Sequence, residues 1–273
     1  MYSCFHSVGL HKLPIIDVIR RSASAGYQAV ELNAETLPWT GPHVTPETTD
    51  EERKAIVSVA AELGLTIPAV GAHIEMLDAD PKAREAAIGY VNGCIDLARD
   101  LNSPIVHILS GPAAKGASED ETRRWFTHAV EKTVEYAEAR GIKLAVEAIV
   151  GHGFRNTDGY HRLAKDLPGV NWYVNFDPSH LEVQGENPRR VVDELMDRIA
   201  HVHIKDGKGL YPDFSFPPMG EGTINFPELI DGLRNGGYDG ALSIEYEAQV
   251  FGFERSDEEI VEGNRAYLKQ FGV

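Results

Sequence analysis

The amino-acid sequence predicts an α/β protein that forms a single (β/α)8 TIM barrel over residues 1–273. Short β-prone runs alternate with longer helical stretches eight times, and no Ser/Gly-rich linker divides the chain. This alternation implies parallel strands joined by right-handed helical crossovers, and eight such units in 273 residues match the usual size of the barrel. A doubly wound sheet is the rival fold, but it usually needs fewer strands, and the GxGxxG phosphate-binding pattern is absent.

The expected elements follow in order along the chain. We expect strands at residues 2–6, 29–34, 66–74, 104–111, 142–150, 172–177, 199–205 and 241–247. We expect helices at residues 14–25, 47–63, 80–101, 119–140, 158–166, 188–197, 226–235 and 254–271. The helical stretches carry apolar residues three and four apart, as at Val130, Val134 and Ala137. Glycine follows several of them, as at Gly26 and Gly141.

Composition excludes several classes of partner. The chain has 42 acidic and 26 basic residues and a formal net charge of -16, which disfavours nucleic acid and anionic membrane as partners. Cys4 and Cys94 are the two cysteines, far apart, so neither a disulfide framework nor a thiolate metal site is expected. The N-terminus lacks a basic segment followed by an apolar one, and no apolar run approaches the length of a membrane span. We therefore expect a cytoplasmic protein.

Ionisable side chains end every expected strand. They are His6, Glu31, His73, His107, Glu147, Asp177 with His180, His203 and Glu245. Active sites of the barrel lie at the C-terminal ends of its strands. Buried carboxylates in this number would repel one another unless a cation or protons neutralised them. The strand ends therefore predict a metal site.

Four of these residues come from strands five to eight and face one another across half of the barrel mouth: Glu147, Asp177, His203 and Glu245. Three carboxylates and one imidazole form a hard, oxygen-rich set that suits Mn²⁺ best, with Co²⁺ or Mg²⁺ as alternatives. Each residue alone has a simpler explanation, such as a salt bridge, a helix cap or a core histidine. His201 lies on the same strand face as His203, and either could be an ordinary core histidine. Glu247 lies on the same strand face as Glu245 and could compete with it as a ligand.

Five segments resemble a known family. They are VEA at 146–148, FDPSH at 176–180, HVHIKD at 201–206, GEGTINF at 220–226 and GYDGALSIEYE at 237–247. They are similar to the xylose-isomerase-like TIM-barrel superfamily of sugar phosphate isomerases and epimerases, which includes ketose 3-epimerases, inosose dehydratase and the large subunits of C-glycoside deglycosidases. The resemblance covers nearly the whole chain and implies the metal ligands Glu147, Asp177, His203 and Glu245. It also implies a substrate-oxygen contact at His180 and polar pocket residues at His73 and His107.

The resemblance implies a divalent-metal-dependent isomerase, epimerase or dehydratase of a keto-sugar or cyclitol, acting by proton abstraction next to a metal-chelated carbonyl. In epimerase members two carboxylates exchange the proton, and their counterparts here are Glu147 and Glu245. A dehydratase or lyase also needs a general acid, for which His152, His180 and Lys205 are candidates. Arg155 and Trp39 are candidates for contacts with the sugar, although both could be ordinary loop residues.

Two other functions remain open at this stage. The first is a metal-dependent lyase that cleaves 3-keto-glycosides, which could have a small partner subunit. The second, more remote, is a DNA repair nuclease of the endonuclease IV type, which shares the barrel. That nuclease uses an Asp-x-His pair shortly after the His203 position, whereas here Asp213 is followed by Phe214 and Ser215. We expect an unphosphorylated carbohydrate substrate, and a homo-oligomer in which the loops at 35–46 and 207–222 reach a neighbour or cover the mouth.

Overall fold

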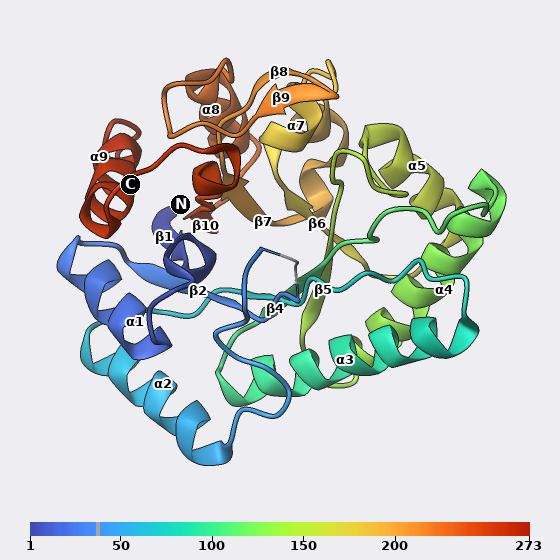
Figure 1. Cartoon of the computed structure of the whole chain (residues 1–273), viewed down its shortest axis with the longest axis horizontal. Coiled ribbons are helices and arrows are strands. Elements are labelled where there is room, and N and C mark those ends of the chain that lie inside the picture. Colours follow the sequence, from blue (N-terminus) through green and yellow to red (C-terminus); the bar gives the residue numbers. More distant parts are fainter. Residues whose placement is uncertain (37–38) are drawn as a thin grey trace.

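The computed structural model describes residues 1–36 and 39–273, and its centre is a closed barrel of parallel strands (Figure 1). In barrel order the strands are β1 (Tyr2–His6), β2 (Ala29–Asn33), β3 (Val70–Gly71), β4 (Ile105–Ile108), β5 (Lys143–Glu147), β6 (Tyr173–Phe176), β7 (Ile199–Ile204) and β10 (Ala241–Ile244). Parallel pairing of β10 with β1 closes the barrel, with Tyr2 opposite Ala241 and Phe5 opposite Ile244. The predicted fold class is confirmed.

Helices form a ring around the barrel (Figure 1). They are α1 (Ile15–Ser24), α2 (Asp50–Glu62), α3 (Pro81–Asp100), α4 (Glu119–Glu138), α5 (Thr157–Asp166), α7 (Arg189–Leu195), α8 (Phe226–Asn235) and α9 (Asn264–Lys269). Reciprocal capping boxes start α2, through Thr49 and Glu52, and α4, through Ser118 and Glu121. In the described part of the chain, none of the helices is both long and apolar enough to span a membrane.

The strands bury different side chains on their two faces. Outward-facing residues such as Val30, Val106 and Val174 join the main hydrophobic core, which they share with the helices. Two separate apolar clusters fill the barrel interior toward the N-terminal ends of the strands. One consists of Cys4, Ala29 and Ala241, and the other of Ala69, Ile105 and Ala145. Because side chains alternate along a strand, the next inward positions toward the C-terminal ends carry the ionisable residues. The barrel interior is therefore polar toward the C-terminal ends of the strands.

Several boundaries differ from those expected. The strand predicted at 66–74 is reduced to β3 and one isolated bridge between Thr66 and Ala29, since Pro68 has no N–H for a strand ladder. The helix predicted at 254–271 begins at Asp257 and contains a π-helical segment, Glu259–Gly263, before α9.

Short elements that the sequence did not predict complete the fold. They are the 3₁₀ turns Ser7–Leu10, Met196–Arg198 and Ala248–Phe251, the short helix α6 (Pro178–Glu182), and the antiparallel hairpin β8 (Lys208–Leu210) and β9 (Asp213–Ser215).

The hairpin belongs to a loop that is fastened by one carboxylate. Asp206 accepts hydrogen bonds from the backbone N–H groups of Gly207 at 2.9 Å, Gly220 at 3.0 Å and Gly222 at 2.9 Å. The two ends of the loop are thereby held together next to the barrel mouth. A β-carbon on Gly222 would collide with the Asp206 carboxylate, so the close approach requires glycine there.

We expect Gly222→Ala to lower the free energy of unfolding by more than about 2 kcal/mol, because the added methyl group displaces Asp206 from its N–H donors. Gly89 lies in α3 with open space around its Cα, so Gly89→Ala is the matched control and should stabilise the chain by up to about 1 kcal/mol. Urea unfolding of both variants measures the difference. Equal stability of Gly222→Ala and wild type would contradict this account of the loop.

Candidate metal and catalytic site

Four acidic and imidazole side chains meet at the mouth of the barrel. Glu147 ends β5, Asp177 follows β6, His203 lies in β7 and Glu245 follows β10. Each offers one ligand atom, these atoms all lie within 4.8 Å of one another, and all four residues are buried. The structure thus brings together the four residues that the sequence proposed as ligands, and we refer to them as the cage.

The cage contains a carboxylate oxygen without a hydrogen-bond partner. Glu147 Oε1 is buried and accepts no hydrogen bond, whereas buried Asp177 Oδ2 forms an ion pair with Lys205. The other Glu147 oxygen is held by the Asn175 side-chain amide, which donates to it at 2.8 Å. Unpaired anionic oxygens are costly in a protein interior unless a cation is near. Three carboxylates and one imidazole are a donor set that fits a hard divalent cation.

Lys205 brings a permanent positive charge to the edge of the cage. Its buried Nζ lies 3.0 Å from Asp177 Oδ2 and 2.8 Å from Glu247 Oε2, and it also contacts Glu245. Burial lowers the pKa of Lys205, but these three carboxylates outweigh burial and raise that pKa well above its usual value. Burial in turn raises the pKa of Glu245, whereas His203 and Lys205 bring it well below its usual value. Lys205 is therefore charged, and Glu245 is ionised at neutral pH.

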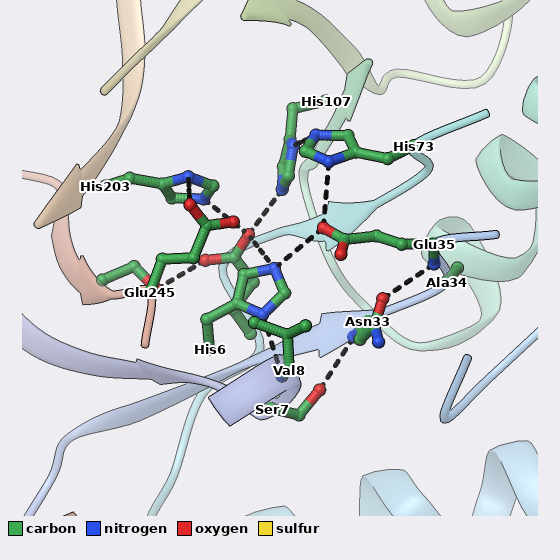
Figure 2. A network of polar contacts seen from close by, with 12 residues as sticks. His6, Ser7, Val8, Asn33, Ala34, Glu35, His73, His107, His203 and Glu245 are labelled. Carbon is green, nitrogen blue, oxygen red and sulfur yellow. Dashed lines mark hydrogen bonds and ion pairs between the residues drawn. The ribbon is translucent and has the colours of Figure 1, made fainter. Parts of the chain in front are cut away.

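A chain of histidines borders the other side of the cage. Figure 2 shows His73 between Glu35 and His107: its Nδ1 lies 3.0 Å from Glu35 Oε1, and its Nε2 lies 2.8 Å from His107 Nδ1. Burial lowers the pKa of His73, but Glu35 and Glu147 outweigh it and raise that pKa to about 10. Burial dominates at His107 and lowers its pKa to about 4. His73 is therefore an imidazolium that donates from both nitrogens, and His107 is neutral.

A cavity of about 220 Å³ adjoins the cage. It is lined by Trp39, His73, Glu75, Leu109, Glu147, Ile149, His152, His180, Lys205, Glu245 and Glu247. Burial and the nearby Lys205 lower the pKa of His180 to about 4, and burial lowers that of His152 to about 4. Both rings are therefore neutral, and the Nδ1 atom of each is buried without a hydrogen-bond partner.

The structure separates the predicted substrate contacts into two groups. Trp39, His73, His152, His180 and Lys205 line the cavity. His107 does not line it, because its fully buried ring lies in the barrel interior. Arg155 is exposed and does not line it either; its guanidinium donates to the His152 carbonyl at 3.4 Å. Neither side chain is thus placed to touch a ligand in this cavity.

The residues that hydrogen-bond to the cage or lie next to it were not identified from the sequence. Asn175 and Ser243 each precede a cage residue by two positions, so strand alternation alone could have placed them on the inward face. Glu35 follows the end of β2 and gave no periodic signal. Glu31 was noted as a strand-end acid but was given no role.

Comparison with known proteins identifies the class. The family model for the xylose isomerase-like TIM barrel matches residues 19–271, and the chain belongs to that family. Its relatives include the fructoselysine 3-epimerase of Shigella flexneri, which is 25% identical over 256 residues, covering 90% of this chain and 88% of that one. The L-ribulose-5-phosphate 3-epimerase of Salmonella paratyphi B is 24% identical over 249 residues, covering 84% and 81%.

Solved structures share the fold across nearly the full length. A D-tagatose 3-epimerase-like protein superposes with a TM-score of 0.80 at 21% identity, covering 99% of this chain and 97% of that one. The IolI protein with a bound zinc atom superposes with a TM-score of 0.78 at 15% identity, covering 97% and 96%.

We expect the stability contributed by His73 to depend on pH. Its folded pKa of about 10 exceeds the usual value of 6.5, so this contribution is complete below about pH 6.5 and is lost as the pH rises toward 10. In chelator, the difference in unfolding free energy between wild type and His73→Gln should shrink by more than about 1 kcal/mol from pH 6 to pH 9. His128→Gln, on the exposed face of α4, is the control and should stay within about 0.5 kcal/mol of wild type at both pH values. A pH-independent difference for His73→Gln would refute the imidazolium assignment.

Proposed function

We propose that the protein is a divalent-metal-dependent epimerase or isomerase of an unphosphorylated keto-sugar. The observation that carries this proposal is the pair Glu147 and Glu245, two carboxylates that share the cage, line the same cavity and project from strands separated by β6 and β7. The family assignment and the sugar epimerases among the relatives support the epimerase or isomerase activity. We propose Mn²⁺ as the ion, held by Glu147, Asp177, His203 and Glu245.

Epimerisation requires one group to remove a proton from carbon and another to return it on the opposite face. Burial raises the pKa of Glu147, but His203 and His73 bring it well below its usual value, so both Glu147 and Glu245 are ionised and able to accept a proton. Asn175 fixes one oxygen of Glu147 and leaves the other free toward the cavity. A divalent ion bound in the cage would polarise the substrate carbonyl and acidify the neighbouring C–H group.

The neutral histidines and Lys205 would orient the sugar. His180 Nε2 accepts from Lys205 Nζ at 3.2 Å, so the proton of this neutral ring lies on Nδ1, which has no partner in the protein and can donate to a substrate oxygen. Lys205 can donate to a second substrate oxygen. Trp39 lines the same cavity and offers an apolar face for the sugar ring.

The charge of the cavity favours an unphosphorylated substrate. Four glutamates line it (Glu75, Glu147, Glu245 and Glu247), Lys205 is the one lysine among its described lining residues, and no arginine is among them. Burial raises the pKa of Glu247 to about 7, so this group is partly ionised near neutral pH. Lys205 is already paired with three carboxylates. The described residues of the cavity therefore offer a phosphate dianion no arginine and no lysine that is free of carboxylate partners, which disfavours phosphate binding.

Replacing either glutamate of the pair should abolish proton transfer. We expect Glu147→Gln and Glu245→Gln to lower kcat/KM by at least about 10²-fold and to abolish deuterium exchange from D₂O into the carbon next to the carbonyl, because the amide cannot accept the proton. Turnover and NMR with Mn²⁺ and a panel of ketoses provide the measurement. Glu75→Gln also lines the cavity but lies outside the cage, and should change kcat/KM less than about threefold.

Wild type stripped with chelator should lose turnover while it stays folded, because the hydrophobic core does not include the cage. A Gln variant that exchanges deuterium at the wild-type rate would show that the base lies elsewhere.

Selectivity against phosphate is a separate expectation. With Mn²⁺, kcat/KM for a free ketohexose should exceed that for its 6-phosphate by at least about tenfold, because the acidic cavity repels the dianion. Parallel initial-rate assays on D-fructose and D-tagatose and on their 6-phosphates give the ratio. A ratio below one would exclude the charge argument and leave the proton-transfer proposal intact.

A further inference from the structure

A fully buried carboxylate lies beneath the cage. Glu31, in β2, has no exposed surface, and it accepts hydrogen bonds from His107 Nε2, from His201 Nε2 at 2.8 Å, from His203 Nε2 at 3.1 Å and from the Ser243 hydroxyl. His107 comes from β4, the other two histidines from β7, and Ser243 from β10. One side chain thus connects four strands across the interior of the barrel.

This arrangement fixes which nitrogen of each ring carries a proton. An ionised carboxylate only accepts hydrogen bonds, so every nitrogen that faces Glu31 must be protonated. Both Glu31 oxygens face donors, because Oε1 lies by His107 Nε2 and His203 Nε2 while Oε2 lies by His201 Nε2 and the Ser243 hydroxyl, so the side chain acts only as an acceptor. His203 Nε2 therefore carries a proton.

The opposite nitrogen of His203 faces the cage. His203 Nδ1 lies 3.3 Å from Glu245 Oε2 (Figure 2). It also lies 3.7 Å from Glu147 Oε1. An imidazole can ligate a cation only through an unprotonated nitrogen, and its orientation is usually set by a hydrogen bond from the other nitrogen. With Nε2 committed to Glu31, Nδ1 is the atom left for a cation.

We propose that Glu31 is the positioning residue of the cage: it holds His203 in the orientation and tautomer that present Nδ1 to the bound ion. This inference rests on the proposed metal site. It also assigns different roles to the two histidines of HVH at 201–203, because His201 directs Nε2 to the other oxygen of Glu31 and keeps that carboxylate in place. Ser243 donates to the same oxygen as His201, whereas His203 Nε2 faces the other oxygen of Glu31.

The test compares Mn²⁺ affinity, by isothermal titration calorimetry, among wild type, Glu31→Gln, Glu31→Met and Ser22→Ala. Glu31→Met removes the acceptor, and Glu31→Gln keeps the shape and loses the charge. We expect the Kd for Mn²⁺ to rise about 10- to 100-fold in both Glu31 variants, the usual effect of losing such a partner. Ser22→Ala is the matched control, since it removes a buried serine hydroxyl that donates to the Val18 carbonyl within α1, and its Kd should stay within about threefold of wild type.

A spectroscopic measurement separates positioning from a general structural role. In ¹⁵N-histidine-labelled, Zn²⁺-loaded wild type, His203 should show a protonated Nε2 that is protected from solvent exchange and a zinc-bound Nδ1. The protection should be lost in the Glu31 variants. Zinc bound through Nε2 in wild type, or a folded Glu31→Gln variant with wild-type Mn²⁺ affinity and a protected Nε2–H, would overturn the inference. Wild type that binds Mn²⁺ while Glu31→Gln binds it equally well would refute only this inference, whereas wild type without Mn²⁺ binding would refute the proposed function as well.

Discussion

The burial of several carboxylates in one small volume is the constraint on which the rest of the structure depends. Glu31, Glu35, Glu147, Asp177 and Glu245 are all buried at the mouth or in the interior of the barrel. Each unpaired buried charge costs several kcal/mol, which is comparable with the entire stability of a typical domain. Every one of these acids accordingly lies close to an imidazole or an ammonium group: Glu35 and Glu147 by His73, Asp177 and Glu245 by Lys205, and Glu31 by three histidines. These pairings determine which side chains at the barrel mouth are charged.

The barrel and the cage could be predicted from the sequence for one physical reason. Closing a parallel sheet brings the C-terminal ends of all its strands to one rim, so residues far apart in the chain, such as Glu147 and Glu245, must meet there. The choice of His203 over His201 rested on the family resemblance and not on strand alternation, because both lie on the inward face and only the register of β7 against its neighbours sets their heights. His203 pairs with Ser243, which places it one inward step from the rim.

The sequence named candidate loop residues but could not predict which of them line the cavity. Arg155 and His152 are three residues apart in one loop, yet only the histidine lines the cavity, because the path of that loop depends on packing between distant segments. Glu35 likewise meets His73 only through the loop that follows β2. The hairpin of β8 and β9 was missed because its strands are three residues each and too short to show a periodic pattern.

That hairpin is attached to the barrel at separate points. Asp206 fastens its base, the Tyr211 N–H donates to the Val183 carbonyl at 2.7 Å near its tip, and Phe216 packs edge-on against His180 with ring centroids 5.0 Å apart. It contributes no strand to the closed barrel and no ligand to the cage. Its residues can therefore be exchanged, in evolution or by grafting, while strand pairing is preserved. A change in the length or sequence of this segment would alter the wall beside His180 without altering the strands that carry the cage.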